Sequence, residues 1–199
     1  MPRRKALASA ALPLGLVGAL GLAGCGSSPA GPSAPTFEGY LCCNLRSDGR
    51  WITDINYEEA GKTIIPVGTP VKVTGYGPQR VLIEVEGSRQ AIGNDYSRTL
   101  RIDAFARRYV VADDPRPKIA TMPAKVREAI NTARVTPGMT REQVVMAVGY
   151  PVTSETPHLD APVWRMWLWT FSKFELHFDG DRLAQIRTDP DTRARVVMP

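Results

Sequence analysis

The sequence is poor in the side chains on which catalysis and metal binding usually depend. Its 199 residues include two histidines, His158 and His177, and three cysteines. Cysteine and histidine do not recur at the spacing of zinc ligands. The motifs typical of serine hydrolases, zinc peptidases, phosphate-binding loops and dinucleotide-binding folds are also missing. We therefore predict a protein that is not an enzyme, with no catalytic residue, metal ion, cofactor or small-molecule substrate.

Beyond the first five positions the sequence also lacks a run or stripe of basic residues. The formal net charge is +5, but Arg3, Arg4 and Lys5 supply three of these charges, and the chain without them carries +2. Proteins that bind nucleic acids concentrate lysine and arginine on one face or along one helix. The sequence therefore predicts no nucleic-acid partner.

The N-terminus combines a basic start with an uncharged apolar stretch. Three basic side chains lie within residues 1–5, and no charge follows from Ala6 to Gly24. This is the layout of a secretory signal. The stretch is long enough to be considered as a membrane span. However, Pro13 and several glycines interrupt it, and no basic stop-transfer cluster follows. We predict that residues 1–24 are a signal peptide.

The end of this stretch, Leu22-Ala23-Gly24-Cys25, resembles the lipobox of bacterial lipoproteins. The resemblance implies a diacylglycerol on the Cys25 sulfur, cleavage after Gly24, and acylation of the amine that the cleavage frees. Two or three acyl chains make membrane attachment effectively permanent. Gly26 stands where enteric lipoproteins kept in the inner membrane carry aspartate, which implies the periplasmic face of the outer membrane. The alternative is an ordinary signal peptide followed by an unrelated cysteine.

Cys25 would begin a short tether over residues 25–36. Positions 26–36 hold only glycine, serine, alanine, proline and threonine, a composition that cannot bury a core. A flexible chain of that length reaches about 18 Å. We therefore expect the folded part of the protein to stand close to the membrane.

Residues 37–112 have the pattern of a β-rich module. Short alternating segments are separated by glycine and proline, and they are predicted as strands at 51–57, 63–65, 71–76 and 81–85. The spacing predicts a small antiparallel β-barrel-like module. The phrase from Ile65 to Val73 resembles the opening of bacterial Src-homology-3-like barrels. Residues 88–112 are ambiguous, and the part from Leu100 to Val111 fits a strand or a short helix.

A linker is expected at 113–120, because a charge pair and two prolines should block regular structure there. After it the apolar period becomes helical over 124–133. Thr140 and Gln143 form a capping-box pattern that starts a second helix, and Gly149 ends it. Strands are predicted at 163–170, 174–178 and 182–187, with a hairpin turn at 179–181. The tail, residues 189–199, is expected to be frayed.

The C-terminal third resembles the BamE/SmpA-OmlA family of outer-membrane lipoproteins over about 135–187. The resemblance lies in Gly138-Met139-Thr140, Gln143-Val144, Val148-Gly149-Tyr150-Pro151, Trp164 and the run from Phe178 to Ile186. It implies that residues 121–188 form two helices packed on a three-stranded antiparallel sheet. With the β module, the expected fold class is α+β. It also implies an envelope protein partner, for which the β-barrel assembly machine is a candidate. Val148 replaces the usual leucine, and the β module is an insertion relative to the family.

Strand alternation at 163–170 places Trp164 in the core and puts Arg165, Trp167 and Trp169 on the opposite face. Tryptophan and arginine dominate the energy of protein interfaces. We therefore predict that Arg165, Trp167 and Trp169 form a partner-binding surface. The alternative is that the β module or the C-terminal tail covers them.

Cys42 and Cys43 are adjacent, in a chain expected in an oxidising compartment. Neighbouring Cα atoms are about 3.8 Å apart, closer than in most disulfides. The pair is therefore read either as two small half-buried residues or as a vicinal or intermolecular disulfide.

Three functions follow from these patterns. The first is a lipid-anchored, non-enzymatic scaffold or accessory factor in outer-membrane protein assembly or envelope integrity. The second is a lipoprotein that binds peptidoglycan or a peptide through its β module. The third is an inhibitor-like protein-binding domain, because two helices on a sheet are shared with β-lactamase-inhibitor-like domains.

Overall fold

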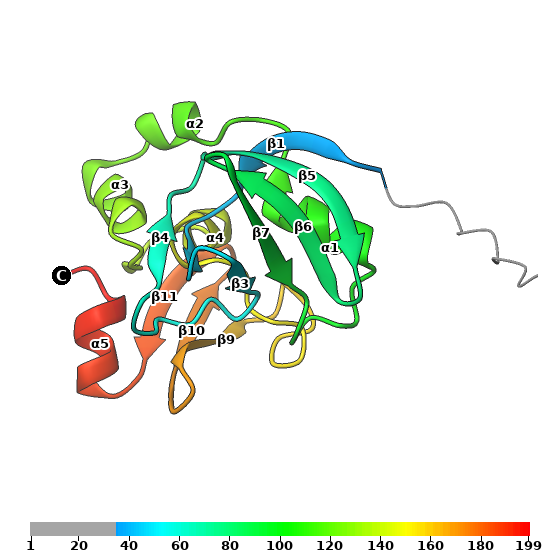
Figure 1. Ribbon diagram of the computed structural model, residues 1–199. Helices are drawn as coiled ribbons and strands as arrows, with labels where there is room; N and C mark the ends of the chain where they lie inside the picture. Colours follow the sequence, from blue (N-terminus) through cyan, green and yellow to red (C-terminus); the bar gives the residue numbers. More distant parts are fainter. Residues whose placement is uncertain (1–34) are drawn as a thin grey trace, which may run out of the picture. The chain divides into compact units, whose positions relative to one another are not determined.

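The computed structural model describes residues 35–199. The predicted signal peptide, Cys25 and most of the tether lie outside this range. Over the described residues the fold is mixed α+β, with five helices, one eight-stranded sheet that curls, and one three-stranded antiparallel sheet (Figure 1). None of the helices in this range is both long and apolar enough to cross a bilayer.

The large sheet has the strand order β4-β2-β3-β7-β6-β5-β1-β8. Its strands are β1 (Phe37–Leu41), β2 (Leu45–Ser47), β3 (Trp51–Thr53), β4 (Thr63–Ile65), β5 (Pro70–Gly77), β6 (Arg80–Val85), β7 (Ser88–Gly93) and β8 (Val110–Val111). Neighbouring strands are antiparallel except β3 and β7, which run parallel. The prediction of a purely antiparallel module is therefore wrong at this one pair.

Alternation along β5 and β6 follows the predicted pattern. Val71 and Val73 are buried, as are Val81, Ile83 and Val85, while the residues between them face solvent. The first predicted strand, 51–57, is too long, because β3 ends at Thr53. Asn56 follows with a φ of 56°, a left-handed conformation that asparagine tolerates better than most residues and that ends the extended chain.

Two helices lie outside the helices that the sequence predicted, one in a region left open between strand and helix and one in the expected linker. The ambiguous region 88–112 contains β7, then α1 (Ile102–Tyr109), whose Phe105 and Tyr109 are buried. The expected linker contains α2 (Arg116–Ala120), so the prediction that its prolines block regular structure is wrong. Both prolines are compatible with a helix start, because the first-turn amides have no intrahelical acceptor to lose.

The predicted helices and strands of the C-terminal part are confirmed, with slightly different ends. They are α3 (Ala124–Asn131), α4 (Arg141–Val148), β9 (Val163–Trp169), β10 (Ser172–Asp179) and β11 (Arg182–Arg187), and the sheet order is β11-β10-β9. The capping box is formed in full, since Thr140 accepts from the Gln143 amide and the Gln143 side chain accepts from the Thr140 amide.

The C-terminal tail is a helix, so the expectation of a frayed end is wrong. Asp189 caps α5 (Pro190–Val196) by accepting a hydrogen bond from the Thr192 amide. Val196 is buried, and its carbonyl accepts from the Val135 amide at 2.8 Å. The two buried residues of this charged segment, Thr192 and Val196, thus fix it to the body of the protein.

The inner faces of the two sheets contribute to one apolar cluster. Val73 and Ile83 of the large sheet belong to the same cluster as Trp164 and Leu176 of the small sheet. Helix α4 contributes all five residues from Val144 to Val148. The segments 37–112 and 121–188 therefore share a hydrophobic core.

Candidate functional site

The predicted lipidation residue, Cys25, lies outside the described residues. The predicted partner-binding residues lie on β9, and their alternation is as expected. Trp164, Met166 and Leu168 are buried on the inner face. Arg165, Trp167 and Trp169 occupy the outer face of the same strand.

Arg165 faces β10, where it forms an ion pair with Glu175 at 3.5 Å. His177 Nε2 lies 3.1 Å from the same carboxylate. A hydrogen bond from His177 lowers the pKa of Glu175, and a hydrogen bond from Arg165 lowers it by a smaller amount. The guanidinium of Arg165 is therefore oriented on the sheet, and about half of its side chain remains open to solvent.

Trp167 is half-buried beside Lys173, whose ammonium lies 5.7 Å from the ring centroid. Within the described chain its buried indole N–H has no hydrogen-bond acceptor. Trp167 therefore offers less contact area than the sequence suggested.

Trp169 keeps 43% of its surface exposed and packs edge-to-face against Phe171, with ring centroids 5.7 Å apart. Phe171 is 84% exposed at the turn between β9 and β10, the orange hairpin that projects at the bottom of Figure 1. Sequence reasoning missed Phe171. The available signal was an aromatic residue in a short hairpin turn, where glycine or asparagine is usual.

We call this surface the hairpin patch: Arg165, Trp167, Trp169, Phe171 and Lys173. From Ala161 to Phe174 the chain contains two basic residues and no acidic one. Trp169 and Phe171 keep 43% and 84% of their surface exposed, so neither is fully covered within residues 35–199. The outer edge of β9 is nonetheless occupied, because Leu168 O accepts from Glu58 N at 2.8 Å. The patch therefore presents side chains and not a free strand edge.

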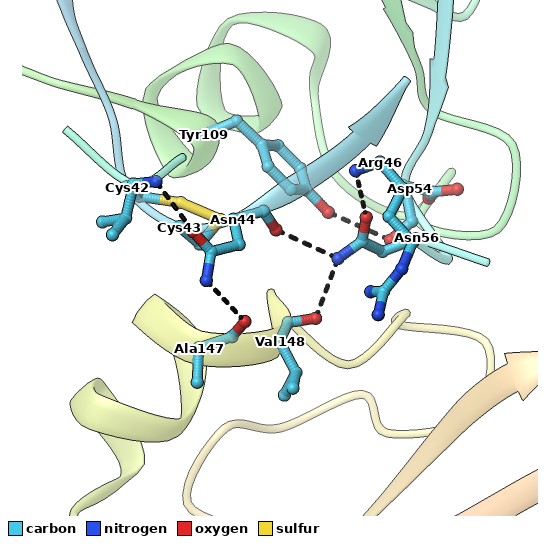
Figure 2. Close-up of a disulfide and its surroundings, with 10 residues drawn as sticks. Cys42, Cys43, Asn44, Arg46, Asp54, Asn56, Tyr109, Ala147 and Val148 are labelled. Atoms are coloured by element: carbon cyan, nitrogen blue, oxygen red, sulfur yellow. Dashed lines mark hydrogen bonds between the residues drawn. A yellow bond between two sulfur atoms is a disulfide. The ribbon is translucent and has the colours of Figure 1, made fainter. Parts of the chain in front are cut away.

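The second candidate region surrounds Cys42 and Cys43, which form a disulfide directly after β1. Cys43 has no exposed surface, whereas Cys42 keeps 6%. The amide of Cys42 donates to Tyr109 O at 3.0 Å, which ties the segment to the end of α1. Of the two interpretations drawn from the sequence, the structure therefore shows the vicinal disulfide (Figure 2).

Two buried asparagines join this segment to the ends of α3 and α4. Asn44 donates to Ile130 O at 2.6 Å and to Ala147 O at 3.1 Å, and it accepts from Val67 N at 2.9 Å. Asn56 donates to Val148 O at 3.0 Å (Figure 2). The last carbonyls of a helix have no partner inside it. The two amide side chains supply those partners from the other side of the core.

Asn56 also binds the segment after the disulfide. It donates to Asn44 O at 3.1 Å and accepts from Arg46 N at 2.7 Å. Tyr109 is fully buried nearby and donates to Asp54 O at 3.3 Å, and its burial raises the pKa of the phenol. Burial likewise raises the pKa of Asp54, although the Tyr96 amide donates to its carboxylate. Together, the hydrogen bonds of Asn44 and Asn56 link the large sheet to helices α3 and α4.

A groove of about 850 Å³ runs over the outer face of β3, β6 and β7. Trp51 forms part of it and lies on Gly93, where an added Cβ would come 2.3 Å from the ring. The guanidinium of Arg80 lies 5.3 Å from the Trp51 ring centroid. Arg50 and Arg89 also line the groove, together with the acidic residues Asp48 and Glu84. None of the three arginines forms an ion pair within residues 35–199.

In the part of the chain that the structure describes, three or more histidine, cysteine, aspartate or glutamate residues do not gather as metal ligands. No family model, curated protein or solved structure matches this chain.

Proposed function

We propose that this protein is a lipoprotein anchored through Cys25 to the periplasmic face of the outer membrane. It binds another envelope protein through the hairpin patch and acts as a non-enzymatic scaffold or accessory factor in outer-membrane protein assembly or envelope integrity. The observation that carries the proposal is the exposed pair of Trp169 and Phe171, held beside Arg165 and Lys173 on a sheet with a buried inner face.

Exposed aromatic pairs of this kind are uncommon on a surface that stays in water. Large aromatic side chains contribute most to binding when a partner removes them from solvent, and arginine is the charged residue most enriched among such positions. Arg165 is paired with Glu175, so the patch offers two aromatic rings beside a held guanidinium and the ammonium of Lys173, which suits a partner with an apolar pocket and polar acceptors around it.

The resemblance to BamE extends this proposal. Two helices, α3 and α4, precede three antiparallel strands in the order that the family pattern implies. We take residues 121–188 as a BamE-like domain, with the β-barrel assembly machine as the expected partner.

The test is affinity purification of the full acylated protein from detergent-solubilised envelopes. We expect the β-barrel assembly machine to be recovered with the wild type and to fall at least about tenfold with Trp169→Ala/Phe171→Ala, because interface hot spots cost about 2 kcal/mol or more. Tyr96→Ala is the matched control, since Tyr96 is also 43% exposed but lies outside the patch. Equal recovery with all three proteins would contradict the proposal, as would recovery of no assembly-machine subunit.

The groove over β6 and β7 supports a second candidate function, binding of a cell-wall glycan or a peptide by the β module. Trp51 lines the groove, and Arg50, Arg80 and Arg89, which form no ion pair within residues 35–199, can bind carboxylates. Cosedimentation of the protein with purified cell wall tests it. Loss of binding in Arg50→Gln/Arg89→Gln would support this function, and absence of wild-type binding would exclude it.

A further inference from the structure

Strand β4 forms one edge of the large sheet and pairs only with β2. On the β2 side, alternate amides point away from β4. Arg46 N donates to Asn56 Oδ1 at 2.7 Å, and Asp48 N donates to Trp51 O at 3.3 Å. Bonded and non-bonded pairs alternate along an antiparallel ladder. Ile64 stands opposite Arg46, so the N–H and C=O of Ile64 point away from β2, toward the free edge.

This free edge is one residue long. On one side of Ile64, the amide of Lys62 is already bound to Glu59 O at 3.2 Å. On the other side, Pro66 has no N–H to offer. A long strand therefore cannot extend the sheet at β4. A single incoming residue can, because it can donate to Ile64 O and accept from Ile64 N.

Ile64 also lines a groove of about 700 Å³ whose other walls come from α2 and α3. Val67 and Ile119 line the same groove and are almost fully buried, whereas Ile64 keeps 41% of its surface exposed. The first two residues therefore form an apolar floor, and Ile64 forms part of the rim. An apolar side chain fits this groove next to the open backbone groups of Ile64.

Two guanidiniums line the groove, from Arg116 and Arg127, and its lining contains no carboxylate. Arg116 is bound to Asp114 at 2.7 Å, so its charge is offset. Arg127 Nη1 donates to Met122 O at 2.6 Å, but the Arg127 guanidinium forms no ion pair within residues 35–199. Arg127 is therefore the cation that remains available to an anionic group in the groove.

We propose that this groove binds the carboxyl-terminal residue of another protein. The terminal residue pairs with Ile64, its apolar side chain lies on Val67 and Ile119, and its carboxylate accepts from Ile64 N and from the Arg127 guanidinium. A chain end fits better than an internal segment, because one residue of sheet edge is open and a free carboxylate suits a guanidinium. This inference is independent of the lipid anchor and of the hairpin patch.

The test uses the whole mature chain, residues 25–199, with Cys25→Ser so that the protein stays in water. The probes are N-acetylated tetrapeptides that end in valine, leucine, methionine or phenylalanine, each made with a free carboxyl terminus and as the terminal amide. Titration followed by amide NMR spectra measures both the affinity and the position of binding. We expect the Ile64 amide resonance to shift. At least one free acid should bind about tenfold more tightly than its amide, because hydrogen bonds between charged groups are the stronger ones.

Two substitutions locate the carboxylate. Arg127→Gln should remove most of the preference for the free acid, whereas Arg134→Gln should not, since Arg134 is also half-buried but lies outside the groove. Ile64→Asp places a negative charge on the exposed rim and should weaken binding of the free acid about fivefold or more. Thr63→Asp is its control, because Thr63 is exposed on the same strand but does not line the groove. Melting temperatures of all four variants show whether each is folded.

Three results would overturn the proposal. The first is equal affinity for every free acid and its amide, and the second is failure of all the peptides to bind the wild type at millimolar concentration. The third is binding that leaves the Ile64 amide resonance unshifted, because the peptide would then occupy another part of the protein.

Discussion

Replacement of Asn44 by alanine should strongly destabilise this protein. The substitution leaves Ile130 O, Ala147 O and Val67 N without their partner, and Asn44 itself is almost fully buried. A buried polar group left unpaired costs about 1–3 kcal/mol. Three such groups, partly relieved by entering water, therefore predict a loss of about 3–5 kcal/mol.

That loss is a large part of the free energy of unfolding, which is about 5–15 kcal/mol for an ordinary domain. Urea unfolding of the wild type and of Asn44→Ala, followed by tryptophan fluorescence and circular dichroism, measures it directly. Asn131→Ala is the control, because Asn131 lies at the exposed end of α3. The reasoning would be refuted by a loss of unfolding free energy below about 1 kcal/mol, or by a loss equal to that of Asn131→Ala. Removal of three buried hydrogen bonds should lower the free energy of unfolding by more than this.

Two further predictions concern the glycine under Trp51 and the behaviour in acid. Gly93→Ala places a Cβ 2.3 Å from Trp51 Cζ2, so it should shift the indole fluorescence and cost about 1–3 kcal/mol by overpacking. Gly75→Ala on β5 is its control, because the added Cβ would meet only Leu82 at 3.6 Å. Hydrogen bonds from Thr192 lower the pKa of Asp189. Its contribution to stability is therefore complete above the ordinary aspartate pKa of about 3.9 and is lost as the pH falls through the lowered value. Asp189→Asn should thus have a lower melting temperature than the wild type at pH 6, and a difference that stays constant down to the acid limit would contradict this assignment.

Local chemistry made much of the C-terminal part predictable. The capping box of Thr140 and Gln143 and the alternation around Trp164 are signals that act between near neighbours, and the structure contains both. The same local reasoning failed at α2 and α5. It treated proline and charge as signs of disorder, although proline fits the first turn of a helix and Asp189 is a good cap.

Long-range pairings were beyond local reasoning. Asn44 bonds to residues 86 and 103 positions away, and nothing near it in the sequence indicates those partners. The parallel pairing of β3 with β7 likewise depends on how the intervening strands fold back. At the hairpin patch the alternation placed Arg165, Trp167 and Trp169 on one face. It could not show that Trp167 is half-buried or that Phe171 is the most exposed aromatic side chain of the patch.

The most direct test of the proposed function is photo-crosslinking in living cells. A photoreactive amino acid replaces Phe171 in the full acylated protein, and the same substitution at Tyr96 serves as the reference position. We predict a discrete crosslink to a subunit of the β-barrel assembly machine from position 171 and none from position 96. Crosslinks to lipid alone, or the same products from both positions, would contradict a protein-binding role for the hairpin patch.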